Sequence, residues 1–234
     1  MNQETQVTGH ISTRFDQELE DIRNRVLTMG GLVENQVNDG IRALVESDRN
    51  VAAKVVETDH RVNRLEVEID EQCVQILARR QPAAGDLRLI VAIIKTITDL
   101  ERIGDQAEKL GRNQLEFEQG ASSDNFVKLE HLGELVSQML NRSLDAFARM
   151  NVEDATKTHA MDERINAEFE GLMRQLITHM MEDPRTIRNA LRISWSARAL
   201  ERIGDHAKNI CEYVIFLVLG KDVRHLDISG QPDL

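Results

Sequence analysis

The sequence is poor in aromatic residues, prolines and cysteines. Aromatic residues make up 3% of the 234-residue chain, which has three prolines and two cysteines. A core with so few aromatic rings depends on Leu, Ile, Val, Met and Ala, a composition that favours helices over sheets. Cys73 and Cys211 stand alone, without the paired spacing of a disulfide framework. We therefore expect a helical protein from a reducing compartment.

The chain also lacks an excess of basic residues and a long apolar segment. It has 29 Lys and Arg against 40 Asp and Glu, which gives a formal net charge of −11. This charge argues against a general affinity for nucleic acid or anionic lipid but leaves room for cations. The longest apolar run, Val214–Leu219, is too short to span a bilayer, and the polar first residues lack the apolar core of a signal peptide. We expect a cytoplasmic protein.

What the chain does contain is an internal repeat. The string LERIGD occurs at Leu100–Asp105 and again at Leu200–Asp205. The residues upstream of the two copies also correspond, which indicates that each half of the chain has the same design. Each half carries Asp-x-x-x-Asn, a proline and Glu-x-x-x-Asp in that order: Asp59, Asn63, Pro82, Glu101 and Asp105; then Asp162, Asn166, Pro184, Glu201 and Asp205.

Apolar residues recur at helical spacing in both halves. In the first half they predict a helix over residues 15–44, a second from a cap at Ser47 to about residue 80, and a third over residues 86–118. In the second half they predict a helix over residues 126–147, another from a cap at Asn151, and a last one that starts at Asp183-Pro184 and ends at Gly220.

The predicted fold is all-α, with six long helices in two tandem and similar three-helix bundles. The first bundle comprises residues 10–118 and the second residues 123–220. Gln119–Ser123 is the clearest linker, and residues 221–234 form a C-terminal tail.

The repeated acidic residues continue apolar helix faces. At about 100° per residue, Glu101 and Asp105 lie on the same face as Ile90, Ile94 and Ile97. The second copy follows the same pattern with apolar and small residues. The acids therefore point toward a neighbouring helix, and the glycine between them in each copy is expected to allow that helix to approach closely.

The second helix of each half carries a polar island within its own apolar stripe. The island comprises Asp59, Asn63 and Glu66 in the first half, and Asp162 and Asn166 in the second. Folding each helix pair back on its proline turn brings the island level with the repeated acids, to within about one turn. Each bundle then holds several carboxylates and an amide at the same height.

Clustered and partly buried carboxylates repel one another, and each unpaired buried ion costs several kcal/mol. Oxygen ligands suit hard divalent or trivalent cations such as Mg²⁺, Mn²⁺ or iron, whereas zinc is less favoured because no cysteine or histidine shares the acidic face. The predicted metal ligands are Glu101, Asp105, Asp59, Asn63 and Glu66 in one site, and Glu201, Asp205, Asp162 and Asn166 in the other. The first half adds acids where the second has Phe169 and Met173, so we predict tighter metal binding at the first site.

Two alternatives remain open. The first is a metal-free helical scaffold, in which basic residues such as Arg102 and Arg202 form ion pairs with the acids. The second is a carboxylate-bridged metalloenzyme, which usually needs Glu-x-x-His ligands; Glu57–His60 has this spacing but lies outside the repeat. No nucleophile-base set or glycine-rich nucleotide motif is present, so we expect a protein that is not an enzyme. His206 is expected to be an ordinary surface or packing histidine.

The two motifs, with ILARRQPAAGDLR before the first and MEDPRTIRNAL before the second, resemble the PhoU family over roughly residues 10–225. The resemblance implies a cytoplasmic, commonly homodimeric protein that modulates phosphate uptake and negatively regulates the phosphate regulon. It further implies an adaptor between the ATPase subunit of the phosphate ABC transporter and the sensor histidine kinase PhoR, which meets the membrane only through these partners.

The resemblance also bears on the metal ligands. Family members bind metals at Glu/Asp-x-x-x-Asp motifs, which implicates Glu101 with Asp105 and Glu201 with Asp205. Asp59 and Asp162 lie at the family's acidic positions on the second and fifth helices. At the matching position four residues after each of these acids, this chain has Asn63 and Asn166, whose neutral amide groups are weaker metal ligands.

Overall fold

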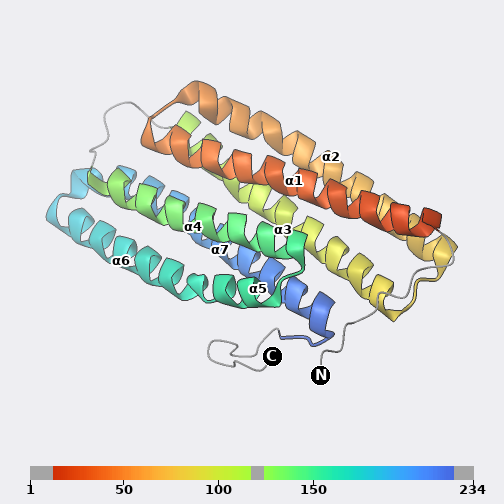
Figure 1. The fold of residues 1–234 in the computed structure, drawn as a ribbon. Coiled ribbons are helices and arrows are strands. Elements are labelled where there is room, and N and C mark those ends of the chain that lie inside the picture. The colour runs from red at the N-terminus through yellow and green to blue at the C-terminus, as the bar shows by residue number, and fades with distance from the viewer. Residues whose placement is uncertain (1–12, 117–123, 224–234) are drawn as a thin grey trace.

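The structure is a computed structural model that describes residues 13–116 and 124–223. These residues form helices and no strand, and no helix among them is both long and apolar enough to cross a membrane. The first bundle consists of α1 (Thr13–Val45), α2 (Arg49–Arg80) and α3 (Ala84–Leu115), and the second of α4 (Asp124–Arg149), α5 (Val152–His159), α6 (Met161–Glu182) and α7 (Ile187–Leu219) (Figure 1). The predicted all-α fold of two three-helix bundles is confirmed. The linker at residues 119–123 and nearly all of the tail lie outside the described residues.

The fifth predicted helix is interrupted once. α5 ends at His159 and α6 begins at Met161, and the two follow one another along the same line (Figure 1). Ala160 between them keeps helical dihedral angles, with φ −67° and ψ −14°. The interruption is therefore local, and α5 and α6 together act as one long helix of the bundle.

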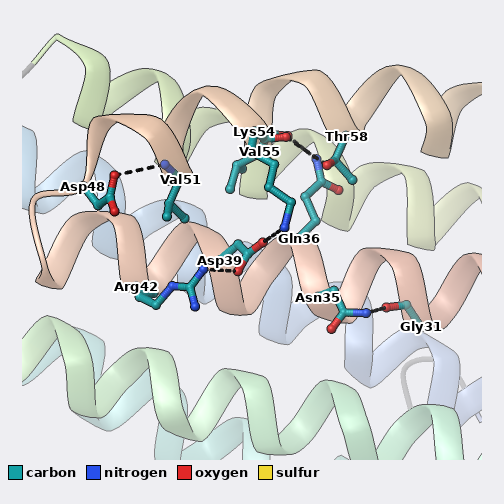
Figure 2. Close-up of polar contacts among 10 residues, drawn as sticks. All are labelled: Gly31, Asn35, Gln36, Asp39, Arg42, Asp48, Val51, Lys54, Val55 and Thr58. Atoms are coloured by element: carbon teal, nitrogen blue, oxygen red, sulfur yellow. Dashed lines mark hydrogen bonds and ion pairs between the residues drawn. The ribbon is translucent and has the colours of Figure 1, made fainter.

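The start of α2 differs by one residue from the predicted one. The carboxylate of Asp48, not the hydroxyl of Ser47, caps the helix and accepts hydrogen bonds from the backbone N–H groups of Asn50 at 2.8 Å and Val51 at 3.1 Å (Figure 2). Ser47 has a φ of 56° and forms the turn before the cap. A carboxylate suits this place because it also interacts favourably with the positive end of the helix dipole. The ends predicted at Asn151 and Gly220 are confirmed. Asp183 is a cap as predicted, but it caps a short 3₁₀ helix, Pro184–Thr186, and α7 begins after it at Ile187.

The two bundles pack against each other through α3 with α7 and through α1 with α4 (Figure 1). Buried apolar residues from all seven α-helices form one continuous core. Near the C-terminal end of α3, the amide of Asn113 donates hydrogen bonds to the carbonyl oxygen of Arg192 at 2.9 Å and to Oγ of Ser196 at 2.6 Å. The two halves of the repeat are thus joined by both apolar and polar contacts.

His206 has a larger role in this contact than its sequence position suggested. Its Nδ1 lies 2.6 Å from Oδ1 of Asp99 on α3, and the amide of Asn209 donates to the same oxygen at 3.1 Å. Asp99 is buried, so its carboxylate needs these partners. His206 was expected to be a surface or packing histidine; the structure places it between the bundles, where it also forms a polar link.

A close approach of α3 to α2 at Gly111 gives a first testable prediction. A Cβ atom at Gly111 would lie 2.9 Å from the carbonyl oxygen of Ala52, which is backbone and cannot turn away. We expect Gly111→Ala to lower the free energy of unfolding by about 1–3 kcal/mol in chemical denaturation. A Cβ atom added at Gly31 would meet no neighbouring atom within 4 Å. We therefore expect Gly31→Ala to raise the free energy of unfolding by about 0.5–1 kcal/mol. Equal effects of the two substitutions would contradict this packing.

Candidate functional site

The first bundle holds a buried carboxylate at the meeting point of α1, α2 and α3. Asp59 on α2 is 4% exposed. Its Oδ1 accepts a hydrogen bond of 3.4 Å from the amide of Gln36, and its Oδ2 accepts one of 3.1 Å from Asn63. A Cβ atom at Gly104 would lie only 3.4 Å from Oδ1 of Asp59 and 3.2 Å from Val62. The glycine of the first LERIGD motif thus allows α3 to come close to this carboxylate, as predicted.

The other predicted acids of the first half surround Asp59. Burial raises the pKa of Glu101, and the charges of Asp105 and Glu66 raise it further. Burial followed by the charge of Asp70 likewise raises the pKa of Glu66. Burial also raises the pKa of Asp59, and the charges of Glu108 and Asp105 raise it further. The hydrogen bond from Gln36 lowers this pKa, but the net shift is upward. The structure therefore brings the predicted first set together, and its members repel one another. We call this set, with Glu108, the first acidic groove.

Gln36 is a member of the groove that the sequence analysis did not identify. It lies on α1, is 2% exposed, and donates to the carbonyl oxygen of Val55 at 3.2 Å (Figure 2). It also donates to Asp59. The signal was present, because the steps of four and three that place Met29 and Val33 in the apolar seam of α1 place Gln36 there next. A polar residue at a seam position indicates a buried polar contact.

Positive charge near the first acidic groove is weak. Arg102 lies 3.8 Å from Glu101 but is 60% exposed, and Arg112, equally exposed, is bound to Glu108 at 2.9 Å from its Nε atom. Exposed pairs of this kind contribute little stability. The acids at the centre of the groove are thus left without a buried cation among the described residues.

The donor set of the first acidic groove suits a hard cation. Oε1 of Gln36 and Oδ1 of Asn63 are buried and accept no hydrogen bond from the described part of the chain. Together with the carboxylates they offer oxygen ligands only. Within residues 13–116 and 124–223, however, no three acidic, histidine or cysteine side chains are arranged to hold one ion as they stand. Cation binding therefore requires the flexible side chains of Glu66 and Glu101 to turn toward Asp59.

The second bundle places a lysine where the first has an acid. Asp162 is 5% exposed, and its Oδ2 accepts hydrogen bonds from Asn166 at 3.1 Å and from Nζ of Lys208 at 2.8 Å. Burial opposes the charge on Lys208, but its bond to Asp162 and the nearby carboxylates outweigh this and raise its pKa. Lys208 follows Glu201 by seven residues, as Glu108 follows Glu101. The repeat thus exchanges a negative for a positive side chain at this point.

Two further acids of the second half have a partner, whereas Asp205 is exposed and forms no ion pair with another residue of the described ranges. Glu201 accepts a hydrogen bond of 3.0 Å from Arg198, and Glu212 lies 3.3 Å from His159. Burial and the charges of Glu201 and Asp162 raise the pKa of Asp205, which Lys208 counters. We call this set of Asp162, Asn166, Glu201, Asp205 and Lys208 the second acidic groove. It has the ion-paired character that the sequence left as an alternative.

Comparison with known proteins assigns the repeat. A model of the PhoU domain matches residues 26–113 and again residues 129–214. The chain belongs to the PhoU family. Each matched segment contains one LERIGD motif and the Asp-x-x-x-Asn before it, so the two PhoU domains contain the two acidic grooves.

Relatives and solved structures agree with this assignment. The chain is 50% identical to the phosphate-specific transport system accessory protein PhoU homolog of Pseudomonas aeruginosa over 95% of this chain and 93% of that protein. It is 49% identical to the phosphate-specific transport system accessory protein PhoU of Escherichia coli K12, over 93% of this chain and 90% of that protein. The crystal structure of PhoU from P. aeruginosa superposes with a TM-score of 0.86, covering 88% of this chain and all of that one at 50% identity. The phosphate transport system regulatory protein PhoU from Streptococcus pneumoniae superposes with a TM-score of 0.83 at 29% identity, covering 89% and 99%.

Proposed function

We propose that the protein is a non-catalytic accessory protein of phosphate-specific transport whose first acidic groove binds a hard cation such as Mg²⁺, Mn²⁺ or iron. The names of its relatives support the transport role. The observation that carries the cation site is the cluster of Asp59, Glu66, Glu101 and Asp105, whose mutual repulsion no buried basic residue of the described chain relieves. A bound cation would neutralise this charge and hold α2 and α3 together.

In this proposal the protein acts as a cytoplasmic, homodimeric adaptor. It links the ATPase subunit of the phosphate ABC transporter to the sensor histidine kinase PhoR and keeps the phosphate-starvation response off when phosphate is plentiful. The support is membership of a family with members named as accessory or regulatory proteins of phosphate transport. Binding of a cation between α2 and α3 would stabilise one arrangement of the first bundle for its partners.

The second acidic groove is proposed to bind the cation more weakly. Asp162, Asn166, Glu201 and Asp205 supply ligands of the same kind, but Lys208 already lies 2.8 Å from the buried carboxylate. A metal ion that binds there would have to displace the ammonium group of Lys208 from the carboxylate of Asp162. No observation favours a metalloenzyme, since His60 of the Glu-x-x-His pair is exposed on α2.

A binding assay tests both parts of the proposal. The purified protein is expected to bind the transporter ATPase and the sensor kinase in the presence of Mn²⁺ and to bind them more weakly in a chelator. Glu101→Gln/Asp105→Asn is expected to bind weakly under both conditions, whereas Glu153→Gln, on the exposed surface of α5, serves as the unaffected control. Absence of binding to either partner would contradict the adaptor role, and binding insensitive to both chelator and variant would contradict the role of the cation.

A further inference from the structure

A groove between the bundles concentrates positive charge on an acidic protein. It encloses about 330 Å³ and is bordered by α3 and α7, which lie side by side at the centre of the molecule (Figure 1). Four of its side chains are basic and one is acidic, although the chain as a whole carries a net charge of −11. The residues that matter here are Lys109, Arg112 and Glu116 from α3 and its end, and Trp195, Arg198 and Arg202 from α7.

The same groove holds the chain's single tryptophan. Trp195 is 61% exposed, so most of its indole ring faces solvent. Large aromatic rings are usually buried, and an exposed one beside guanidinium groups offers a flat apolar face within a positive field. Planar aromatic rings such as nucleobases stack on a surface of this kind without needing a particular hydrogen-bond pattern.

Two of the four basic side chains are available to a ligand. Arg112 is held by Glu108, and Arg198 by Glu201 at 3.0 Å. Lys109 and Arg202 are exposed, and neither forms an ion pair with another residue of the described ranges, 13–116 and 124–223. A lysine and an arginine from opposite sides of a groove suit an anion with several charged oxygens.

We propose that this groove binds a nucleoside polyphosphate, with the base stacked on Trp195 and the phosphates between Lys109 and Arg202. The volume falls within the range of small-molecule sites, and the basic residues come from two helices that pack side by side. An acidic protein segment would meet the same charge. The concave shape and the ring beside the cations favour the smaller ligand. None of the lining residues is a member of either acidic groove, although Arg112 pairs with Glu108 and Arg198 with Glu201. Because the test is run without free metal ions, its outcome does not depend on the proposed cation site.

The test uses the full chain in a chelating buffer, so that no metal complex of the ligand forms. ATP, ADP, adenosine, inorganic triphosphate and inorganic phosphate are titrated by calorimetry, and the fluorescence of Trp195 is followed in parallel with correction for absorbed light. We expect saturable binding of ATP and ADP with quenching of Trp195, at least about tenfold weaker binding of adenosine and inorganic phosphate, and binding of triphosphate without quenching.

Variants assign the binding to the groove. Lys109→Ala/Arg202→Ala is expected to weaken ATP binding by at least about tenfold. Trp195→Leu should weaken the binding of ATP but leave that of triphosphate unchanged. Lys128→Ala, which removes a basic side chain at an exposed position on α4, is the control for loss of surface charge and should behave as wild type. The proposal is overturned if ATP does not bind, if inorganic phosphate binds as tightly as ATP, or if ATP binding is the same in the double variant. Binding of polyglutamate without binding of ATP would assign the groove to a protein partner and would equally overturn it.

Discussion

Glu101→Gln/Asp105→Asn is expected to make the metal-free protein more stable than wild type and to remove its stabilisation by Mn²⁺. In the wild type these two acids contribute to a cluster in which burial and mutual repulsion raise the pKa values of Glu101, Glu66 and Asp59. Neutral amides of nearly the same shape remove the repulsion and the charge that attracts a cation. Thermal and chemical denaturation, each with and without Mn²⁺, measure both effects on the same variant.

The size of the Mn²⁺ effect follows from linkage. A ligand at a hundred times its dissociation constant stabilises the folded state by about 2.7 kcal/mol. For a chain of this length, each kcal/mol shifts the melting temperature by about 2–4 °C. We therefore expect wild type to gain roughly 5–10 °C in saturating Mn²⁺ and the double variant to gain almost nothing. The matched control is Glu201→Gln/Asp205→Asn in the second acidic groove, which should keep most of the Mn²⁺ response.

The pH dependence of the metal-free protein has a definite sign. A carboxyl group whose pKa is higher in the folded than in the unfolded state stabilises the fold most fully when it is protonated, below its ordinary pKa. The ordinary values are 3.8 for Asp59 and 4.5 for Glu66 and Glu101. The stability that these protonated groups contribute is then lost as the pH rises through their raised pKa values in the folded protein. The loss over this interval should be smaller in Glu101→Gln/Asp105→Asn, and a loss as large as in wild type would show that these acids do not repel one another.

Lys208→Ala is expected to destabilise the protein and at the same time to strengthen the response of the second bundle to Mn²⁺. The substitution leaves the buried carboxylate of Asp162 without its cation. Loss of a buried pair costs about 3–5 kcal/mol, and we expect about 1–3 kcal/mol here because the side chain of Lys208 is 32% exposed and water can partly replace it. Mn²⁺ should recover part of this loss, since a metal ion can occupy the space vacated by the ammonium group.

Two further variants separate this effect from a general loss of packing. Lys208→Ala/Asp162→Asn removes both charges and should be more stable than Lys208→Ala alone, as a double-mutant cycle would show. Lys157→Ala, which breaks an exposed pair with Glu153, is expected to change the free energy of unfolding by less than about 1 kcal/mol. If Lys208→Ala costs no more than Lys157→Ala, or gains no additional Mn²⁺ response, Lys208 does not act as the built-in cation of the second acidic groove.

The sequence predicted the helices and the two acidic faces because both depend on local spacing. The repeated LERIGD motif and the apolar stripes give the order of the helices, and the proline turn of the first half brings Asn63 and Glu66 to within about a turn of Glu101 and Asp105. Such a register is good to about 5 Å, the rise of one turn. An ion pair such as Lys208 with Asp162 at 2.8 Å requires a finer placement than this, so helical spacing alone did not show the pair.

Contacts between elements that are distant in the chain were harder to predict. The pairing of His206 with Asp99 depends on how one bundle packs on the other, which periodicity within each helix does not specify. Gln36 was missed for a different reason, because the candidate site was built from two helices of the bundle and α1 supplies a third wall. The choice of Asp48 over Ser47 as a cap is a difference of one residue between two good capping side chains.

The central claim is that the first acidic groove binds a hard cation more tightly than the second because its charge is uncompensated. Calorimetric titration of Mn²⁺ into chelator-treated protein tests this most directly, with wild type compared with Glu101→Gln/Asp105→Asn and with Glu201→Gln/Asp205→Asn. We predict saturable binding that is lost in the first variant and retained in the second. Unchanged binding in the first variant, or no binding of Mn²⁺ to wild type, would contradict the account.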